Sequence, residues 1–177
     1  DHNLWTGYRW LKPGKWYNRI QVNYNAHHSS LYKKIPGQKI NSGFQSFSMN
    51  VNANVQFKNL WWAGVYVGYG SRGNNFYEPR TTGYSFRSPS RMQYDIWFES
   101  NSTKKYYFGM DYFLGIRSLF NSPNHNISFW HRYRFSDKFS ISHNLYYNPA
   151  RNDAGYYGRH YRQDANRNYV LDANGDR

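Results

Sequence analysis

The strongest constraint on the fold is a strict two-residue alternation across residues 47–58. Every odd position in this segment is apolar, from Phe47 to Phe57, and every even position is polar, from Ser48 to Lys58. Successive side chains of a β-strand point to opposite sides of a sheet, so the segment is predicted to be one strand. Its two faces must therefore meet two unlike environments.

The same alternation recurs along the chain and extends the prediction from one strand to a sheet. It is clear in residues 20–26, 61–69, 92–99, 106–117 and 139–148, and weaker in residues 4–10 and 127–135. Together with residues 47–58, these segments make eight candidate strands. No segment carries a strong helical signal.

The connections between the candidate strands differ in length in a regular way. Short turns fall at residues 12–15, 58–59, 101–104 and 136–138, and long connections at residues 28–43, 70–91 and 119–126. This arrangement is typical of up-and-down antiparallel barrels in outer membranes. We therefore predict an all-β fold in which residues 1–148 form strands, short periplasmic turns and long external loops. Residues 149–177 are predicted to be an external Asn/Asp-rich loop or an incomplete tail.

The composition of the two faces indicates which one meets water. The polar face of residues 47–58 holds mainly Ser, Asn and Gln, and glycine recurs on the same face of other strands. These small, uncharged residues suit a crowded polar lumen. The alternative is a soluble β-sandwich with the apolar face inward. A conventional core would be hard to build, because Leu, Ile and Val are scarce while aromatic residues make up 21% of the chain.

Aromatic residues beside the short turns give a second test. By the parity of the alternation, eight of them lie on the apolar face next to the four short turns: Trp10, Trp16, Phe57, Trp61, Phe98, Tyr106, Phe135 and Phe139. Such a row is predicted to be an aromatic girdle at one membrane interface. Eleven residues at a rise of ~3.3 Å and a tilt of ~40° span roughly 28 Å, close to the apolar band of a bilayer. We therefore predict a transmembrane β-barrel in a bacterial outer membrane.

The placement of the chain ends favours a larger barrel. If the short turns are periplasmic, both ends of the chain lie outside, whereas a complete bacterial barrel normally has both ends in the periplasm. We expect these strands to be part of a larger barrel, although eight strands can close alone. The longest weakly polar run, residues 60–70, is shorter than the ~18 apolar residues of a membrane-spanning helix.

Four segments resemble one known family. Residues 3–13, 56–61, 76–80 and 133–140 are similar to the C-terminal barrel region of uncharacterised Bacteroidetes outer-membrane proteins. Members of that family carry an upstream carbohydrate-binding family 9-like module. The resemblance implies a membrane barrel that acts in surface glycan binding or transport. It supplies no catalytic residues.

Charged residues on the polar face are the main candidates for chemistry. The predicted lumen charge cluster comprises Asp95, Glu99, Asp111, Arg117, Arg132 and Arg134. Hairpin pairing places Asp95 opposite or diagonal to Asp111, and paired carboxylates are what glycoside hydrolysis uses. The alternative is an ion-pair network, including Lys105, that braces the barrel wall or biases permeation. We favour the network, so no catalytic residue is assigned and no enzyme is predicted.

The C-terminal segment suggests one candidate metal site. Oxygen ligands recur there at alternate positions, at Asp164, Asn166, Asn168 and Asp172, with a spacing similar to that of calcium loops. The match is incomplete, because Tyr169 stands where the turn requires Gly and Gly175 where the last carboxylate belongs. A solvated loop is the alternative. No other cofactor is predicted, and the chain has no cysteine.

The chain is strongly basic, with 23 Lys and Arg against 10 Asp and Glu. Charge alone fits nucleic acid or phosphorylated lipid. Because basic residues gather in the long loops, we expect the lipid bilayer and lipopolysaccharide as partners, with glycans and other outer-membrane proteins as further candidates, and no nucleic acid. Three functions stay open: glycan binding or transport, a structural subunit of a protein export or assembly complex, and an outer-membrane hydrolase.

Overall fold

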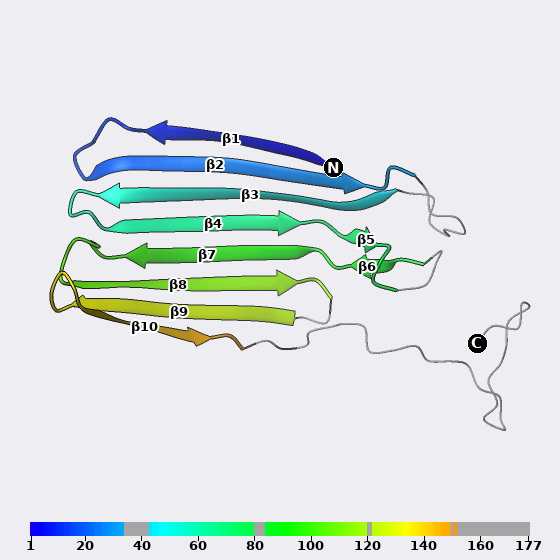
Figure 1. Cartoon of the computed structure of the whole chain (residues 1–177). Helices are drawn as coiled ribbons and strands as arrows, with labels where there is room; N and C mark the ends of the chain where they lie inside the picture. The colour runs from blue at the N-terminus through cyan, green and yellow to red at the C-terminus, as the bar shows by residue number, and fades with distance from the viewer. Residues whose placement is uncertain (34–42, 80–83, 120–121, 150, 152–177) are drawn as a thin grey trace, which may run out of the picture.

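The computed structural model describes residues 1–33, 43–79, 84–119, 122–149 and 151. Eight of its strands form one antiparallel sheet in the order β1-β2-β3-β4-β7-β8-β9-β10 (Figure 1). These strands are β1 (His2–Trp10), β2 (Tyr17–Ser30), β3 (Phe44–Phe57), β4 (Trp62–Gly70), β7 (Arg91–Glu99), β8 (Tyr106–Arg117), β9 (Ser122–Arg134) and β10 (Ser140–Tyr147). Within this sheet, strands that follow one another along the chain are neighbours, and β5 and β6 lie outside the sheet. This order confirms the predicted all-β antiparallel meander.

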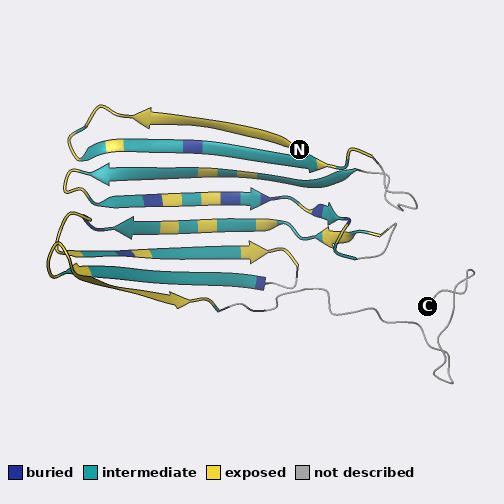
Figure 2. Ribbon diagram, viewed as in Figure 1, coloured by how far each residue is buried: buried dark blue, intermediate teal, exposed yellow. Residues whose placement is uncertain are grey.

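The sheet does not close into a barrel. Closure requires hydrogen bonds between the first and last strands, and β1 and β10 lie at opposite ends of the strand order. In the part of the chain that the structure describes, each of these two strands pairs on one side only. Figure 2 shows both of them exposed along their whole length. The predicted all-β fold with eight antiparallel strands is therefore confirmed. The sheet that these strands form is open, whereas a closed barrel was predicted.

The short turns lie together at one end of the sheet (Figure 1). Between β3 and β4, the amide of Phe57 donates to the carbonyl of Trp61 at 2.8 Å, and Leu60 adopts a positive φ of 66°. Between β7 and β8, the side chain of Asn101 accepts a hydrogen bond from the amide of Thr103 at 2.9 Å. Such local hydrogen bonds set the hairpin register.

A second, two-stranded sheet lies within the long connection at residues 70–91. It consists of β5 (Gly73–Asn75) and β6 (Phe86–Ser88), and the alternation did not predict it. The side chain of Asn74 donates to the carbonyl of Phe44 at 3.0 Å. A Cβ at Gly73 would overlap the carbonyl oxygen of Gln45, so only glycine permits this approach to β3. This small sheet therefore docks against the long-loop end of β3.

The main sheet is a single layer. Among the described residues, the strands of this sheet contact no strands other than their sheet neighbours and β5, and Phe76, 6% exposed, is the only buried hydrophobic residue. Large apolar side chains in mid-strand stay open, including Val51 at 46% and Ile96 at 58%. A layer that covers one face of a sheet normally supplies the core of a domain. Here, no described element does so. The described residues also include no helix long and apolar enough to cross a bilayer.

Candidate binding surface on the polar face

The register across the sheet sorts the side chains into two continuous faces. One rung runs from Asn23 through Asn52, Tyr66 and Asp95 to Phe113. The next rung, on the opposite face, runs through Tyr24, Val51, Val67, Tyr94 and Leu114. The alternation within each strand is therefore aligned between strands. We call the side that carries Asn52 the polar face.

A ladder of amides covers the β2–β3 part of the polar face. The side chain of Asn23 donates to Asn52 at 2.9 Å, and that of Asn25 donates to Asn50 at 2.9 Å. Gln21 donates to Asn23 at 2.9 Å, and Asn52 donates to Asn50 at 3.2 Å. Side-chain amides satisfy one another in this way without any net charge. This explains the run of asparagines at alternate positions.

Two indole rings lie flat across neighbouring strands on the polar face. A Cβ at Gly64 would stand 2.4 Å from Cε2 of Trp97, and a Cβ at Gly109 would stand close to the ring of Trp130. Each tryptophan is paired with its glycine on the adjacent strand. The glycines therefore make room for the rings, which cover backbone that glycine leaves bare.

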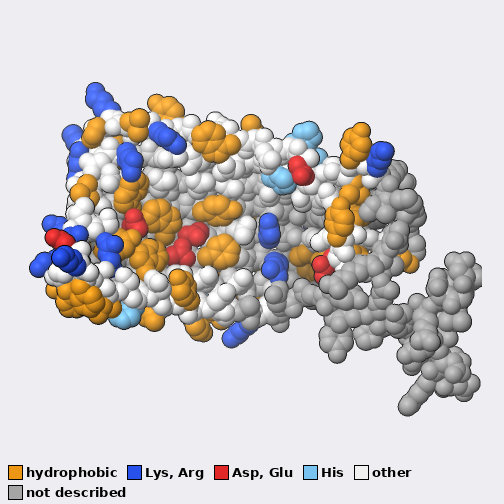
Figure 3. All heavy atoms as spheres, viewed as in Figure 1, with side chains coloured by type: hydrophobic (Ala, Val, Ile, Leu, Met, Phe, Trp, Pro, Cys, Tyr) orange, Lys and Arg blue, Asp and Glu red, His pale blue; other side chains and the backbone are white. Residues whose placement is uncertain are grey.

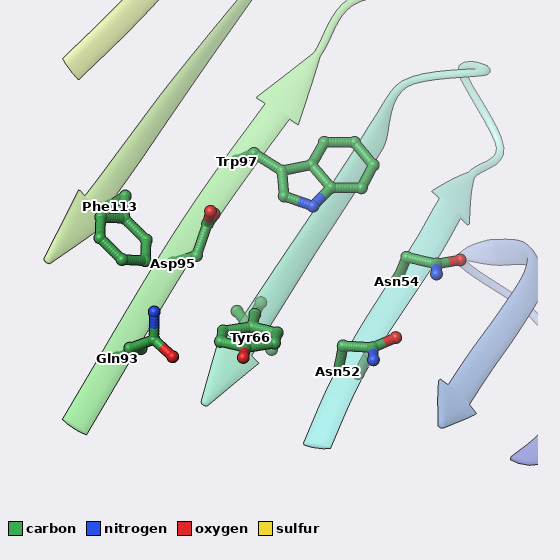
Figure 4. Close-up of a pocket in the computed structure, with 9 residues that line it drawn as sticks. Asn52, Asn54, Tyr66, Gln93, Asp95, Trp97 and Phe113 are labelled. Atoms are coloured by element: carbon green, nitrogen blue, oxygen red, sulfur yellow. The ribbon is translucent and has the colours of Figure 1, made fainter. Parts of the chain in front are cut away.

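A hollow of about 340 Å³ opens on the polar face where β3, β4, β7 and β8 run side by side (Figure 4). Its labelled side chains are Asn52, Asn54, Tyr66, Gln93, Asp95, Trp97 and Phe113. Three are aromatic, three are amides and one is a carboxylate. The hollow thus combines flat apolar surface with a few polar groups, which is the usual make-up of a small-molecule site.

The carboxylates of the predicted cluster do not all meet. Asp95 pairs with Phe113 and Trp97 with Asp111, so Asp95 and Asp111 are diagonal neighbours across β7 and β8. Asp95 lies in the hollow, and its Oδ1 is buried without a hydrogen-bond partner among the described residues. Glu99 lies further toward the short turns.

Glu99 belongs to a separate hydrogen-bonded chain. The hydroxyl of Tyr107 donates to Oε2 of Glu99 at 2.5 Å, and the indole N–H of Trp130 donates to the hydroxyl of Tyr107 at 3.2 Å. The guanidinium of Arg132 lies 5.3 Å from the centre of the Tyr107 ring. These hydrogen bonds link β7, β8 and β9 near the short-turn end.

The three arginines of the predicted cluster lie outside the hollow. Arg132 donates to the carbonyl of Ser102 at 3.0 Å, and Arg134 donates to the carbonyl of Thr103 at 3.0 Å, so both hold the β7–β8 turn. Arg117 ends β8 at the long-loop end, paired with Arg91. The six charged residues of the predicted cluster therefore lie in three places on the polar face: at the hollow, near the short turns and at the long-loop end.

Six of the eight predicted girdle residues meet one another in pairs along the short-turn end. Trp16 and Phe57 have ring centres 6.0 Å apart, and Phe135 and Phe139 5.3 Å apart. The rings of Trp61 and Phe98 are stacked at 6.4 Å. The remaining two contact aromatic residues outside the predicted set: Tyr106 lies 5.7 Å from Phe108, and Trp10 lies 4.5 Å from Tyr8. Lys and Arg side chains gather at the same end (Figure 3).

Comparison with known proteins identifies the family. Residues 1–172 match a family described as a domain of unknown function, DUF5916. The chain belongs to the DUF5916 family. No curated protein and no solved structure matches the chain. Membership in the DUF5916 family assigns no activity, so any function of this DUF5916 domain must be argued from its residues.

The predicted calcium ligands of the DUF5916 domain lie outside the described residues. They are Asp164, Asn166, Asn168 and Asp172. Most of the segment at residues 149–177 is likewise outside them. Within the described part of the chain, no group of three or more His, Cys, Asp or Glu side chains is placed to hold a metal ion.

The hollow of the DUF5916 domain could not be predicted from the sequence. Trp97 lies on the polar face of the alternation, and its role depends on Gly64 of a strand that a long connection separates from it. The signal is a glycine and a tryptophan on the same face of two strands. The pairing of these two residues can be recognised only once the β4–β7 register is known.

Proposed function

We propose that this domain forms part of the wall of a transmembrane β-barrel in a bacterial outer membrane and acts in surface glycan binding or transport. In this arrangement the apolar face meets lipid and the polar face lines the lumen. The observation that carries the proposal is the single-layer sheet, whose apolar face is exposed in mid-strand. In water such a face would promote association or aggregation, whereas against hydrocarbon it is stable.

The length of the strands supports this placement. The shortest central strands, β4 and β7, have 9 residues each, and β3 has 14. At ~3.3 Å per residue and a tilt of ~40°, these span roughly 23 and 35 Å. An apolar band of about 25 Å fits within that range. The ring contacts and lysines at the short-turn end fit the interface at one edge of the band.

Among the described residues, β1 and β10 each have one edge that no strand pairs with, which supports a barrel of more than these strands. A sheet edge in hydrocarbon leaves backbone N–H and C=O groups without partners, which costs several kcal/mol per group, so membrane sheets close. Further strands that join β1 to β10 would satisfy both edges. The resemblance to the barrel region of Bacteroidetes outer-membrane proteins points the same way.

A role in handling glycans is supported by the chemistry of the polar face. Amides and flat aromatic rings dominate it around the hollow, and sugars bind through hydroxyl hydrogen bonds and stacking on such rings. The net charge of +13 suits contact with lipopolysaccharide phosphates at the outer surface.

Membrane insertion and conductance of the full-length gene product test this proposal. We expect the protein in the outer-membrane fraction, folded in detergent with a shift in gel mobility on heating. In planar bilayers it should give discrete conductance that soluble oligosaccharides reduce. Recovery in the soluble fraction, with no insertion into vesicles, would contradict the barrel assignment.

The edges of β1 and β10, which no strand in the described part of the chain pairs with, also favour a second candidate, a structural subunit of an outer-membrane export or assembly complex. An unpaired edge accepts a strand from another protein by β-augmentation. Purification under mild detergent separates the two candidates. A stoichiometric partner protein, lost when prolines are placed in β1, would favour the second, and an isolated conducting barrel the first.

A further inference from the structure

We infer that the hollow around Trp97 is a binding subsite for neutral saccharides, with the indole as the surface on which a pyranose ring stacks. The inference rests on the proposed function, because it places the subsite on the wall of a lumen. Four observations carry it: the support of the ring, the free polar groups, the charge of the hollow and its height on the strands.

The indole of Trp97 is held as a platform. One side of the ring lies on the backbone at Gly64, too close for any Cβ there. In Figure 4 the ring extends from β7 across β4, with Tyr66 and Gln93 further along the same hollow. A ring supported on one side offers its other side to a ligand with little loss of side-chain entropy.

Polar groups around the platform are free to bind hydroxyls. Among the described residues, the side-chain amides of Asn54 and Gln93 have no hydrogen-bond partner, in contrast to the amide ladder nearby. Asp95 also lines the hollow, although its Oδ1 is buried away from the opening. Sugar hydroxyls donate and accept, and this set supplies amide donors together with amide and carboxylate acceptors. The volume of about 340 Å³ lies at the lower end for a small-ligand site.

The charge of the hollow selects against acidic sugars. Asp95 lines it and Asp111 is its diagonal neighbour. The guanidinium groups of Arg132 and Arg134 are bound to carbonyls of the β7–β8 turn, and Arg117 lies at the other end of β8. A carboxylated or sulfated sugar would therefore meet like charge.

The hollow lies at mid-height on the sheet. Asp95 is the central residue of β7, which spans Arg91–Glu99. In a barrel this height is the middle of the lumen, so a saccharide in transit would pass the platform. The proposed subsite thus gives the lumen a preference for neutral sugars.

Isothermal titration of the full-length gene product in detergent tests the inference. The probes are maltohexaose, cellohexaose and laminarihexaose, with a polygalacturonate oligomer as the acidic comparison. We expect saturable binding of at least one neutral probe and none of the acidic one. Trp97→Leu should weaken that binding at least about tenfold, equal to ~1.4 kcal/mol. Trp130→Leu, which removes the matching indole outside the hollow, should change it less than about twofold.

A second pair of variants removes side-chain amides that make no hydrogen bond among the described residues, so folding should be unaffected. Asn54→Ala should weaken binding roughly fivefold, equal to ~1 kcal/mol. Asn144→Ala, on the same face of β10, should leave it unchanged. The inference is overturned if no neutral probe binds at millimolar concentration, if the acidic probe binds more tightly, or if each variant and its control lose binding equally. A protein that inserts into vesicles but binds no sugar refutes the subsite alone, whereas failure to insert refutes the barrel.

Discussion

Replacing Val51 by Arg separates a membrane-facing sheet from a water-facing one. Val51 lies in mid-strand on the apolar face, paired with Tyr24 and Val67, and its side chain is 46% exposed. If lipid covers it, an Arg near the bilayer midplane costs about 2–4 kcal/mol. That lowers the folding equilibrium constant roughly 30- to 700-fold. If water covers it, an exposed substitution changes stability by only about 0.5 kcal/mol.

The matched control is Asn54→Arg, three residues along β3 and on the polar face. Asn54 lines the same hollow as the Asp95 carboxylate, so a guanidinium there is solvated and partly neutralised. We expect less than about 1 kcal/mol of change. The assay is urea titration of the full-length protein in phospholipid vesicles, read by gel mobility without heating. Equal midpoints for the two variants would refute the assignment of faces.

Three further changes test local features by the same titration. Gly64→Ala should cost about 1–3 kcal/mol by forcing the indole of Trp97 off the sheet, and the loss should shrink in combination with Trp97→Ala; additive losses would refute the contact. Leu60→Gly should raise the free energy of unfolding by about 1 kcal/mol, because glycine adopts a φ of 66° without the steric strain that leucine has there. A lower free energy of unfolding would contradict the turn geometry. Tyr107→Phe should cost about 1–3 kcal/mol by leaving Glu99 unpaired, whereas no change would show that the 2.5 Å bond is unimportant.

The sequence was sufficient to predict the sheet, because period-two alternation constrains each strand locally. Val51 and Asn52 belong to opposite faces whatever the neighbouring strands do. Short turns then set the register of hairpins, so the proximity of Asp95 and Asp111 could be predicted, with the structure resolving it as diagonal. The small β5–β6 sheet could not be found, because three-residue strands give no periodic signal.

The candidate site was harder to predict, since it depends on contacts across a long connection. Trp97 faces Gly64 through the β4–β7 register, which residues 71–90 leave undetermined in the sequence. The charge cluster was predicted only from the alternation of side chains along each strand. The alternation shows which face a residue is on, but not how far along the sheet it lies. Arg117 shares a face with Glu99 yet lies at the opposite end of the sheet.

Site-directed spin labelling along β3 tests most directly whether the apolar face meets lipid. Residues 1–177 contain no cysteine, so single cysteines at residues 50–55 label this domain at one position at a time. With the protein in vesicles, labels at Val51, Ala53 and Val55 should be accessible to oxygen and shielded from a water-soluble nickel reagent. Labels at the intervening asparagines should show the reverse. Equal access of the nickel reagent to both sets would contradict a membrane wall.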